Sequence, residues 1–180
     1  MEFETIITER LLLKKVTPHE LKHIFGKYSR DEAKEFFGFT SDDEYTSEKR
    51  KSDIGYTSYN RSILQFLFVD KETQKTIGRG GFHNWFFLHH RSELGYLISD
   101  VNFRQKGLMN EALKAIMDYG FTKMNLHRIE AFTGTDNIAS IRLLEKNGFT
   151  REAVLREHYL LDGAFVDSIV FSKLKHEHKS

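Results

Sequence analysis

The segment from Glu93 to Phe121 constrains the fold of this chain more than any other. It begins as an apolar strand at residues 94–98, passes through a polar turn and continues as an amphipathic helix. The apolar face of that helix carries Leu108, Ala112, Ala115, Ile116 and Tyr119, and the polar face carries Asn110, Glu111, Lys114 and Asp118. The pattern predicts a strand, a loop and a helix in series, with the helix lying on a sheet.

The turn between that strand and that helix is suited to a phosphate group. The first N–H groups of a helix lack intrahelical partners, and the helix dipole places partial positive charge there. Arg104 and Lys106 add charge, and Gly107 lets a ligand approach the backbone closely. An Arg-x-x-Gly step taken alone is more typical of a basic turn before a core helix.

Length and composition indicate one ordered domain spanning residues 1–180. The 27 basic and 26 acidic side chains nearly cancel, which argues against a nucleic-acid or membrane-surface partner. The N-terminus carries no basic region and no apolar run is long enough to span a bilayer, so we expect a cytoplasmic protein. The chain has no cysteine, which excludes a disulfide framework, a thiolate metal site and a cysteine nucleophile. The histidines lack metal-ligand spacing, and we predict no metal.

The first half of the chain predicts a strand, helices and a hairpin. Residues 8–16 form the strand, and a capping box at Thr17 with Pro18 at the first helical position begins a helix. Further helices are predicted near 31–37 and 46–59, and strands 63–69 and 76–83 form the hairpin. The acidic run at 42–44 is either a solvated face or a means of attracting a cationic substrate. The aromatic run at 85–87 is either the edge of the core or a pocket wall.

The second half predicts the rest of a mixed sheet. A strand at 128–133 precedes a helix that Asp136 caps and that Asn147 and Gly148 end. Strands 149–155 and 165–172 follow, joined around residues 162–163, and residues 175–180 form a charged tail that is expected to fray. The fold class is therefore α/β.

Several motifs, in this order, resemble the GNAT (GCN5-related) N-acetyltransferase superfamily, and within it the RimJ/RimL-type ribosomal-protein-alanine acetyltransferase group. They cover Thr8–Leu11, Ser92–Tyr96, Gly107–Leu113, Asn125–Ala131, Asn137–Phe149 and Leu155–Tyr159. The resemblance spans nearly the whole chain. It implies the α+β GNAT fold, a central mixed and mostly antiparallel sheet with helices on both faces.

The resemblance also implies acetyl-CoA as cosubstrate. In the family, a Gln/Arg-x-x-Gly-x-Gly/Ala loop binds the pyrophosphate, and Arg104–Met109 matches it except that Met109 replaces the small residue. The turn is also about one residue longer than is usual in the family. The residues expected to bind acetyl-CoA are Leu97, Ile98, Ser99, Arg104, Gln105, Lys106, Gly107, Leu108, Met109, Asn110 and Asn137.

Two residues are the catalytic candidates. Glu93 matches the position where many family members keep a base, but it could instead be an edge-strand carboxylate paired with Arg91 or another basic residue. Ser140 lies one helical turn after Asn137 and would assist departure of the thiolate, or else satisfy backbone groups at the helix N-terminus.

The predicted reaction is direct attack of an amine on the acetyl thioester in a ternary complex, since no cysteine is available to form an acyl-enzyme. The acceptor that the resemblance favours is a protein N-terminal α-amine. A small-molecule amine (a polyamine, an aminoglycoside or an amino acid) is one alternative, and a non-catalytic acyl-CoA-binding module is another. The protein would be a monomer or a homodimer.

Overall fold

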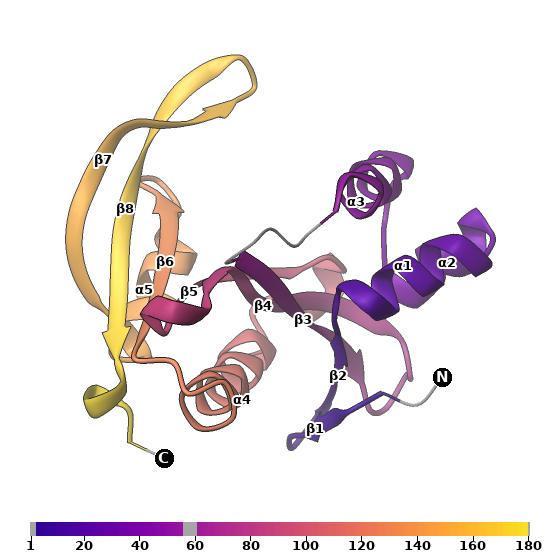
Figure 1. The fold of residues 1–180 in the computed structure, drawn as a ribbon, viewed down its shortest axis with the longest axis horizontal. Coiled ribbons are helices and arrows are strands. Elements are labelled where there is room, and N and C mark those ends of the chain that lie inside the picture. The colour runs from indigo at the N-terminus through magenta and orange to yellow at the C-terminus, as the bar shows by residue number, and fades with distance from the viewer. Residues whose placement is uncertain (1–2, 56–60, 180) are drawn as a thin grey trace.

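An eight-stranded sheet and five α-helices make up the fold (Figure 1). A computed structural model describes residues 3–55 and 61–179. The strands are β1 Thr5–Ile7, β2 Leu11–Val16, β3 Arg61–Asp70, β4 Thr76–Phe86, β5 Arg91–Ile98, β6 Arg128–Gly134, β7 Thr150–Leu161 and β8 Ala164–Leu174. The helices are α1 Pro18–Lys27, α2 Arg30–Phe37, α3 Asp42–Ile54, α4 Leu108–Thr122 and α5 Ile138–Lys146, and the short 3₁₀ turns are Phe87–His89, Val101–Phe103 and Lys175–Glu177.

The strands run in the order β1-β2-β3-β4-β5-β6-β8-β7. Every neighbouring pair is antiparallel except β5 and β6, which are parallel. Strands β5 and β6 pair only over residues 91–93 and 128–130. Beyond Glu93 the two strands separate, while β5 stays paired with β4 and β6 stays paired with β8. The sheet therefore opens between its two halves directly after Glu93.

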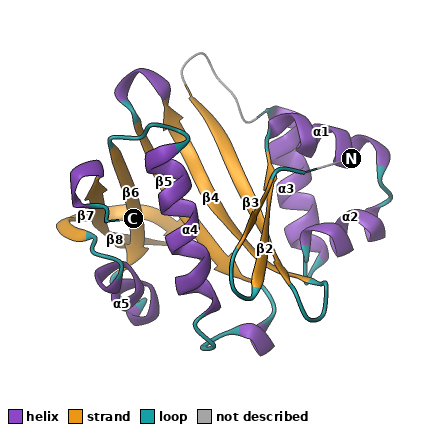
Figure 2. Ribbon diagram, turned by 90° about the horizontal axis from the view of Figure 1, so that it is seen from below, coloured by secondary structure: helices purple, strands orange, loops and turns teal. Residues whose placement is uncertain are grey.

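Helix α4 covers one face of the sheet at this opening (Figures 1 and 2). It buries the predicted apolar face, including Leu108, Ala112 and Ile116, in the main core with aromatic side chains of β3 and β4. A Cβ at Gly120 would lie 2.5 Å from the Phe82 ring, so a glycine is required for the helix to approach β4 this closely.

Helices α1, α2 and α3 lie on the opposite face. Leu67 joins their smaller apolar cluster, whereas its neighbours on β3, Phe66 and Phe68, join the α4 core. Because successive side chains of a strand point to opposite faces, the two clusters lie on the two sides of the sheet. The predicted mixed, mostly antiparallel sheet with helices on both faces is confirmed.

Several element boundaries differ from the prediction. Strand β1 is an additional strand, and α3 begins at Asp42 because the Ser41 side chain accepts the Glu44 N–H. Residues 56–59 of the predicted helix lie outside the described residues. The cap of α5 is Asn137 rather than Asp136, and the tail is ordered as far as His178, whose ring lies 4.8 Å from that of Phe121.

The acidic run at 42–44 serves the structure of α3. Asp42 pairs with Arg30 and Lys34, and Glu44 accepts hydrogen bonds from Thr40. The aromatic run at 85–87 is part of the edge of the core: Trp85 packs against the α4 cluster and Phe87 is exposed. The aromatic run therefore matches the core-edge alternative.

Candidate active site

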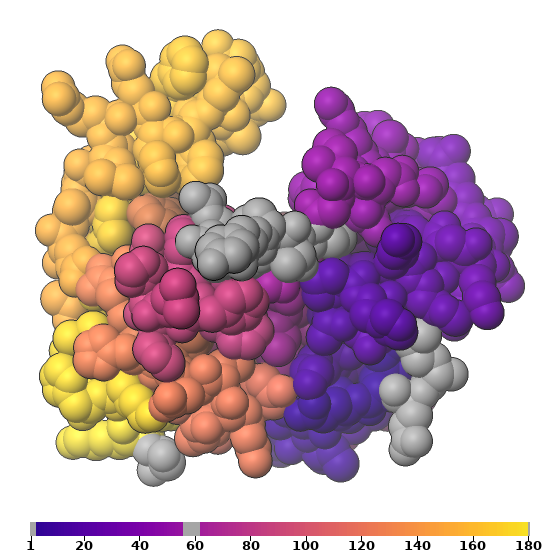
Figure 3. All heavy atoms as spheres, in the orientation of Figure 1, coloured from indigo at the N-terminus to yellow at the C-terminus, as the bar shows by residue number. Residues whose placement is uncertain are grey.

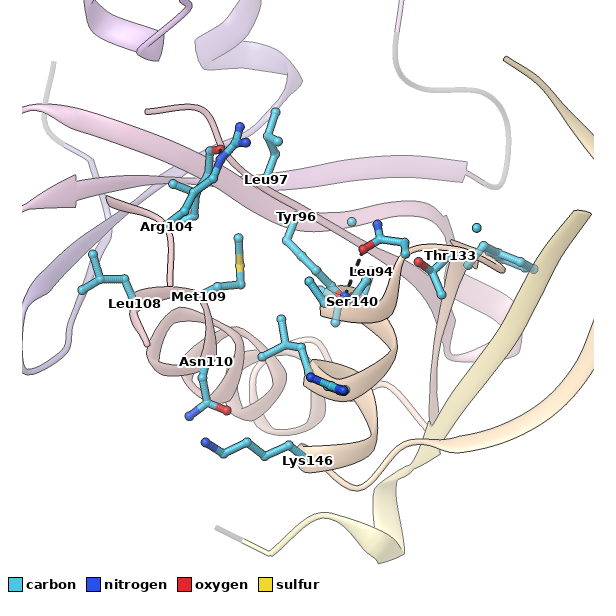
Figure 4. A pocket seen from close by; sticks show the side chains of 18 of the residues that line it. Leu94, Tyr96, Leu97, Arg104, Leu108, Met109, Asn110, Thr133, Ser140 and Lys146 are labelled. Atoms are coloured by element: carbon cyan, nitrogen blue, oxygen red, sulfur yellow. Dashed lines mark hydrogen bonds between the residues drawn. The ribbon is translucent and has the colours of Figure 1, made fainter. Parts of the chain in front are cut away.

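A cleft of about 870 Å³ occupies the opening between β5 and β6 and is closed by α4 and α5 (Figure 4). It brings together eleven of the thirteen residues predicted from the sequence: Glu93, Leu97, Ile98, Arg104, Gln105, Gly107, Leu108, Met109, Asn110, Asn137 and Ser140. Ser99 and Lys106 do not line it. The Ser99 side chain is buried, and Lys106 points its ammonium group toward the ring of Phe103.

The first turn of α4 faces the cleft without a side-chain cap. Gly107 is the N-cap in the left-handed conformation, with φ of 78°, and within the described residues no side-chain capping hydrogen bond is formed. The free N–H groups of this turn and the dipole of α4 suit an anion such as a pyrophosphate. Arg104 is held at the cleft wall because its Nε donates to the Ile98 carbonyl at 3.1 Å.

Arg10 links the loop before α4 to the first turn of that helix. Its Nη1 donates to the Lys106 carbonyl at 2.9 Å, and its Nε donates to Glu111 at 2.8 Å. Thr8 also donates to Glu111 at 2.6 Å. Burial raises the pKa of the Glu111 carboxyl, but these hydrogen bonds outweigh that effect and lower it overall. The Thr8–Leu11 motif thus supports the loop that the sequence predicts to hold phosphate.

The backbone of β5 presents alternate residues to the cleft. The Ser99 N–H donates to the Ile77 carbonyl at 2.9 Å, toward β4, whereas the Ile98 carbonyl accepts from Arg104 on the other side. Because backbone groups of successive strand residues point to opposite edges, Leu97 also directs its N–H toward β4. Ser99, which was expected to bind acetyl-CoA, therefore directs its N–H into the sheet, and Ile98 is the residue with backbone groups facing the opening.

Helix α5 supplies Asn137 and Ser140. The Asn137 side-chain oxygen accepts the Ser140 N–H at 3.1 Å, so Asn137 caps the helix while lining the cleft. The Ser140 hydroxyl lies 2.7 Å from the Tyr96 hydroxyl, which reaches it from β5 (Figure 4). Burial raises the pKa of Tyr96, and the contact with Ser140 opposes this effect without cancelling it.

Glu93 lies on the cleft wall with both carboxylate oxygens occupied. The His83 Nε2 lies 2.8 Å from Oε1, and the Asn84 side-chain amide donates to Oε2 at 2.9 Å. The expected alternative partner, Arg91, pairs with Glu130 instead. Burial raises the pKa of Glu93, but the hydrogen bonds and charge of His83, with the amide of Asn84, outweigh it and lower the pKa overall.

Four functional candidates that line the cleft were not predicted from the sequence: Tyr96, His83, Arg142 and Lys146. Arg142 and Lys146 are four residues apart on α5 and therefore share a helix face, a spacing visible in the sequence. They lie with Asn110 at the basic end of the cleft, where anionic groups would be favoured.

The cleft fits a long ligand with phosphate groups and an extended polar arm. The uncapped helix turn and the basic end would hold phosphates, and the separated strands would accept the arm. The Thr133 hydroxyl is buried in this wall without a hydrogen-bond partner among the described residues, and a ligand could supply one. Among all the residues that the structure describes, no group of three or more potential metal ligands occurs, and no helix has the length and apolarity to cross a membrane.

Comparison with known proteins agrees with this geometry. Residues 10–150 match the acetyltransferase (GNAT) domain family. The chain is 32% identical over 174 residues to an uncharacterized N-acetyltransferase, YoaA, of Bacillus subtilis (strain 168), covering 96% of this chain and 98% of that protein. It is 31% identical over 91 residues to spermidine N(1)-acetyltransferase of Escherichia coli (strain K12), covering 51% and 48%.

The solved structures show the same fold. The ribosomal-protein-S5-alanine acetyltransferase of Vibrio fischeri superposes with a TM-score of 0.68 at 22% identity, covering 98% of this chain and all of that one. The family match covers most of the chain, and several relatives along nearly its full length are named N-acetyltransferases. The chain therefore belongs to the GNAT acetyltransferase family and is an N-acetyltransferase.

Proposed function

We propose that this enzyme transfers the acetyl group of acetyl-CoA to a protein N-terminal α-amine, as the RimJ/RimL-type ribosomal-protein acetyltransferases do. GNAT acetyltransferases use acetyl-CoA. With no cysteine in the chain, the amine attacks the thioester directly in a ternary complex.

The cofactor side of this proposal rests on the α4 loop and α5. The N–H groups after Gly107 hold the pyrophosphate, with Arg104 beside them. Ile98 receives the pantetheine arm through its backbone, and Asn137 lines the path between the loop and the reacting atoms. Ser140 assists departure of the thiolate, and Glu93 is required for removal of the amine proton.

The charge of the cleft is the observation that favours a peptide over a polyamine. A polyamine carries several ammonium groups, each of which needs a carboxylate or another acceptor. Among the described residues that line the cleft, Glu93 is the single carboxylate, and it is already engaged by His83 and Asn84. In the acidic run on α3, which does not line the cleft, Asp42 pairs with Arg30 and Lys34, and Glu44 accepts from Thr40. A peptide N-terminus brings one ammonium group and suits this composition.

Spermidine remains the second candidate because a spermidine N(1)-acetyltransferase is similar to half of this chain. A competition assay separates the two candidates. The enzyme is given acetyl-CoA with equal concentrations of spermidine and of short peptides that begin with alanine, serine or methionine, and the products are measured by mass spectrometry. We expect peptide acetylation to dominate, with an N-terminally blocked peptide as the unreactive control. Preferential acetylation of spermidine would contradict the proposed acceptor.

A further inference from the structure

We propose that His83 is the proton acceptor of the reaction and that Glu93 is the residue that positions its ring. This inference rests on the proposed acetyl transfer to an amine and specifies how the amine loses its proton. The sequence pointed to Glu93 as the base, and the contacts around Glu93 point to its neighbour.

Both oxygens of the Glu93 carboxylate contact protein groups. Oε1 contacts the His83 ring and Oε2 accepts from the Asn84 amide, at 2.8 and 2.9 Å. Its side chain is 14% exposed, whereas that of His83 is 42% exposed. A carboxylate that already accepts two hydrogen bonds is a weak proton acceptor, in agreement with the lowered pKa of Glu93.

The same contact determines which ring nitrogen of His83 can take a proton. Nε2 faces the carboxylate, so the neutral ring donates Nε2–H to Glu93 and keeps its lone pair on Nδ1. Nδ1 has no hydrogen-bond partner among the described residues. The ring lies over Gly95, where an added Cβ would come within 3.3 Å of Nδ1 and 2.9 Å of Cε1. The absence of a side chain at Gly95 thus lets the His83 ring lie against β5 at this position.

The sheet fixes this arrangement. His83 and Glu93 are direct cross-strand partners of β4 and β5, so their side chains share a face. The ladder becomes irregular directly after His83, and Asn84 takes a positive φ of 48°, which accompanies its side-chain contact with Glu93. Glu93 is also the last residue of β5 that pairs with β6, so the pair lies where the cleft opens.

The proposed proton transfers balance. The acceptor arrives as an ammonium ion, and His83 Nδ1 removes one proton to give the neutral amine. The amine nitrogen attacks the carbonyl carbon, a C–N bond forms, and the C–S bond breaks. The second proton on the nitrogen passes to the departing thiolate to give the thiol, and His83 releases the first proton to solvent. The Glu93 carboxylate stabilises the imidazolium ion in between.

Other charged groups surround the pair. His158 and Tyr159 of β7 interact electrostatically with Glu93, and Arg79 of β4 lines the same small groove as His83. His158 is therefore a stringent control, since it is a second exposed histidine near the same carboxylate.

The test compares His83→Gln, Glu93→Gln and His158→Gln through the pH dependence of kcat/KM, with the best acceptor from the competition assay. In the parent we expect kcat/KM to rise with pH along an ascending limb that reports deprotonation of the base. His83→Gln should remove that limb and lower kcat/KM about 10²-fold at neutral pH. Its activity should recover at high pH as the amine loses its own proton, and the KM for acetyl-CoA should stay unchanged. Glu93→Gln should lower kcat/KM but keep the ascending limb. His158→Gln should keep both the limb and the parent rate.

A limb that survives in His83→Gln and disappears in Glu93→Gln would overturn the proposal, because Glu93 would then be the base. Nitrogen NMR of the histidine rings gives a reading that needs no acceptor. At neutral pH, His83 should carry its proton on Nε2 and not on Nδ1, and the reverse tautomer would also overturn the proposal. Failure to acetylate any amine, by contrast, would contradict the proposed function and leave the NMR result standing.

Discussion

The hydroxyl groups of Tyr96 and Ser140 lie 2.7 Å apart, although 44 positions separate the two residues in the chain. One comes from β5 and the other from α5, and both line the cleft. Whichever hydroxyl donates to the other, the acceptor's own proton is left free to turn toward a ligand. The two residues thus form one polar unit at the place where the proposed thiolate departs.

Ser140→Ala is expected to lower kcat by up to about 10²-fold and to leave acetyl-CoA affinity nearly unchanged. A group that stabilises developing negative charge contributes little before that charge forms. Steady-state kinetics and calorimetry with acetyl-CoA measure the two quantities. The Asn137 cap of α5 uses the Ser140 N–H, which alanine retains, so the thermal stability should change little. A large loss of stability with normal kcat would instead assign Ser140 to the helix.

Tyr96→Phe removes the same hydrogen bond from the other side while keeping the ring that fills the wall. If the two hydroxyls act as a unit, the double variant should be little slower than Ser140→Ala alone. Additive losses would show that each hydroxyl acts independently.

Gly107→Glu should abolish acetyl-CoA binding within the range of calorimetry. The added carboxylate would lie beside the N–H groups of α4 and repel the phosphates. The positive φ at Gly107 also makes any side chain there cost about 1 kcal/mol or more of stability. Gly163→Glu is the matched control, since Gly163 has φ of 81° at the β7–β8 turn, with open space around it. It should share the loss of stability and keep the affinity; equal affinity of Gly107→Glu and the parent would refute the loop assignment.

Arg10→Ala should weaken acetyl-CoA binding several-fold, because the loop loses its tie through the Lys106 carbonyl and Glu111. The pair is partly exposed, so the loss of stability should stay near ~1 kcal/mol. Arg30→Ala breaks an exposed ion pair with Asp42, away from the cleft, and serves as the control. If both variants bind acetyl-CoA as the parent does, Arg10 has no part in holding the loop.

Glu152 should contribute acid-sensitive stability. Its hydrogen bonds from Arg128 and Ser172 hold the pKa of the carboxyl at about 2, below its value of 4.5 when unperturbed. A lowered pKa stabilises the fold above the unfolded value, and this contribution is lost as the pH falls from 4.5 toward 2. Because the Glu152 side chain is 38% exposed, solvent screening keeps the effect below ~1 kcal/mol. Melting curves of Glu152→Gln should converge with those of the parent across that range, and a constant difference would contradict this account.

Local patterns in the sequence predicted the elements that depend on local interactions. The apolar spacing of α4, the capping box at Thr17 and the glycine at 107 each act within a few residues, so a single segment carries the signal. The cofactor side of the cleft lies largely in one such segment. Most of the residues predicted to bind acetyl-CoA therefore line the cleft, whereas the Ser99 N–H donates to the Ile77 carbonyl of β4.

The acceptor side depends on pairing between segments. His83 meets Glu93 only through the β4–β5 register, and Tyr96 meets Ser140 only after α5 packs across the opening. Strands 76–83 and 94–98 were both predicted, but register shifts such as the one after His83 leave no clear local signal. A surface hollow likewise lies between the β7–β8 hairpin and α3, which are far apart in the sequence (Figure 3).

The most direct test of the account supplies acetyl-CoA labelled in the acetyl group, with and without the peptide and polyamine acceptors, and follows every product by mass spectrometry. We expect label on an amine nitrogen, one free CoA for each amide formed, and no change in the mass of the enzyme. Label on the protein itself before it reaches the amine would contradict direct attack. Binding of acetyl-CoA without acetylation of any amine would contradict the proposed function.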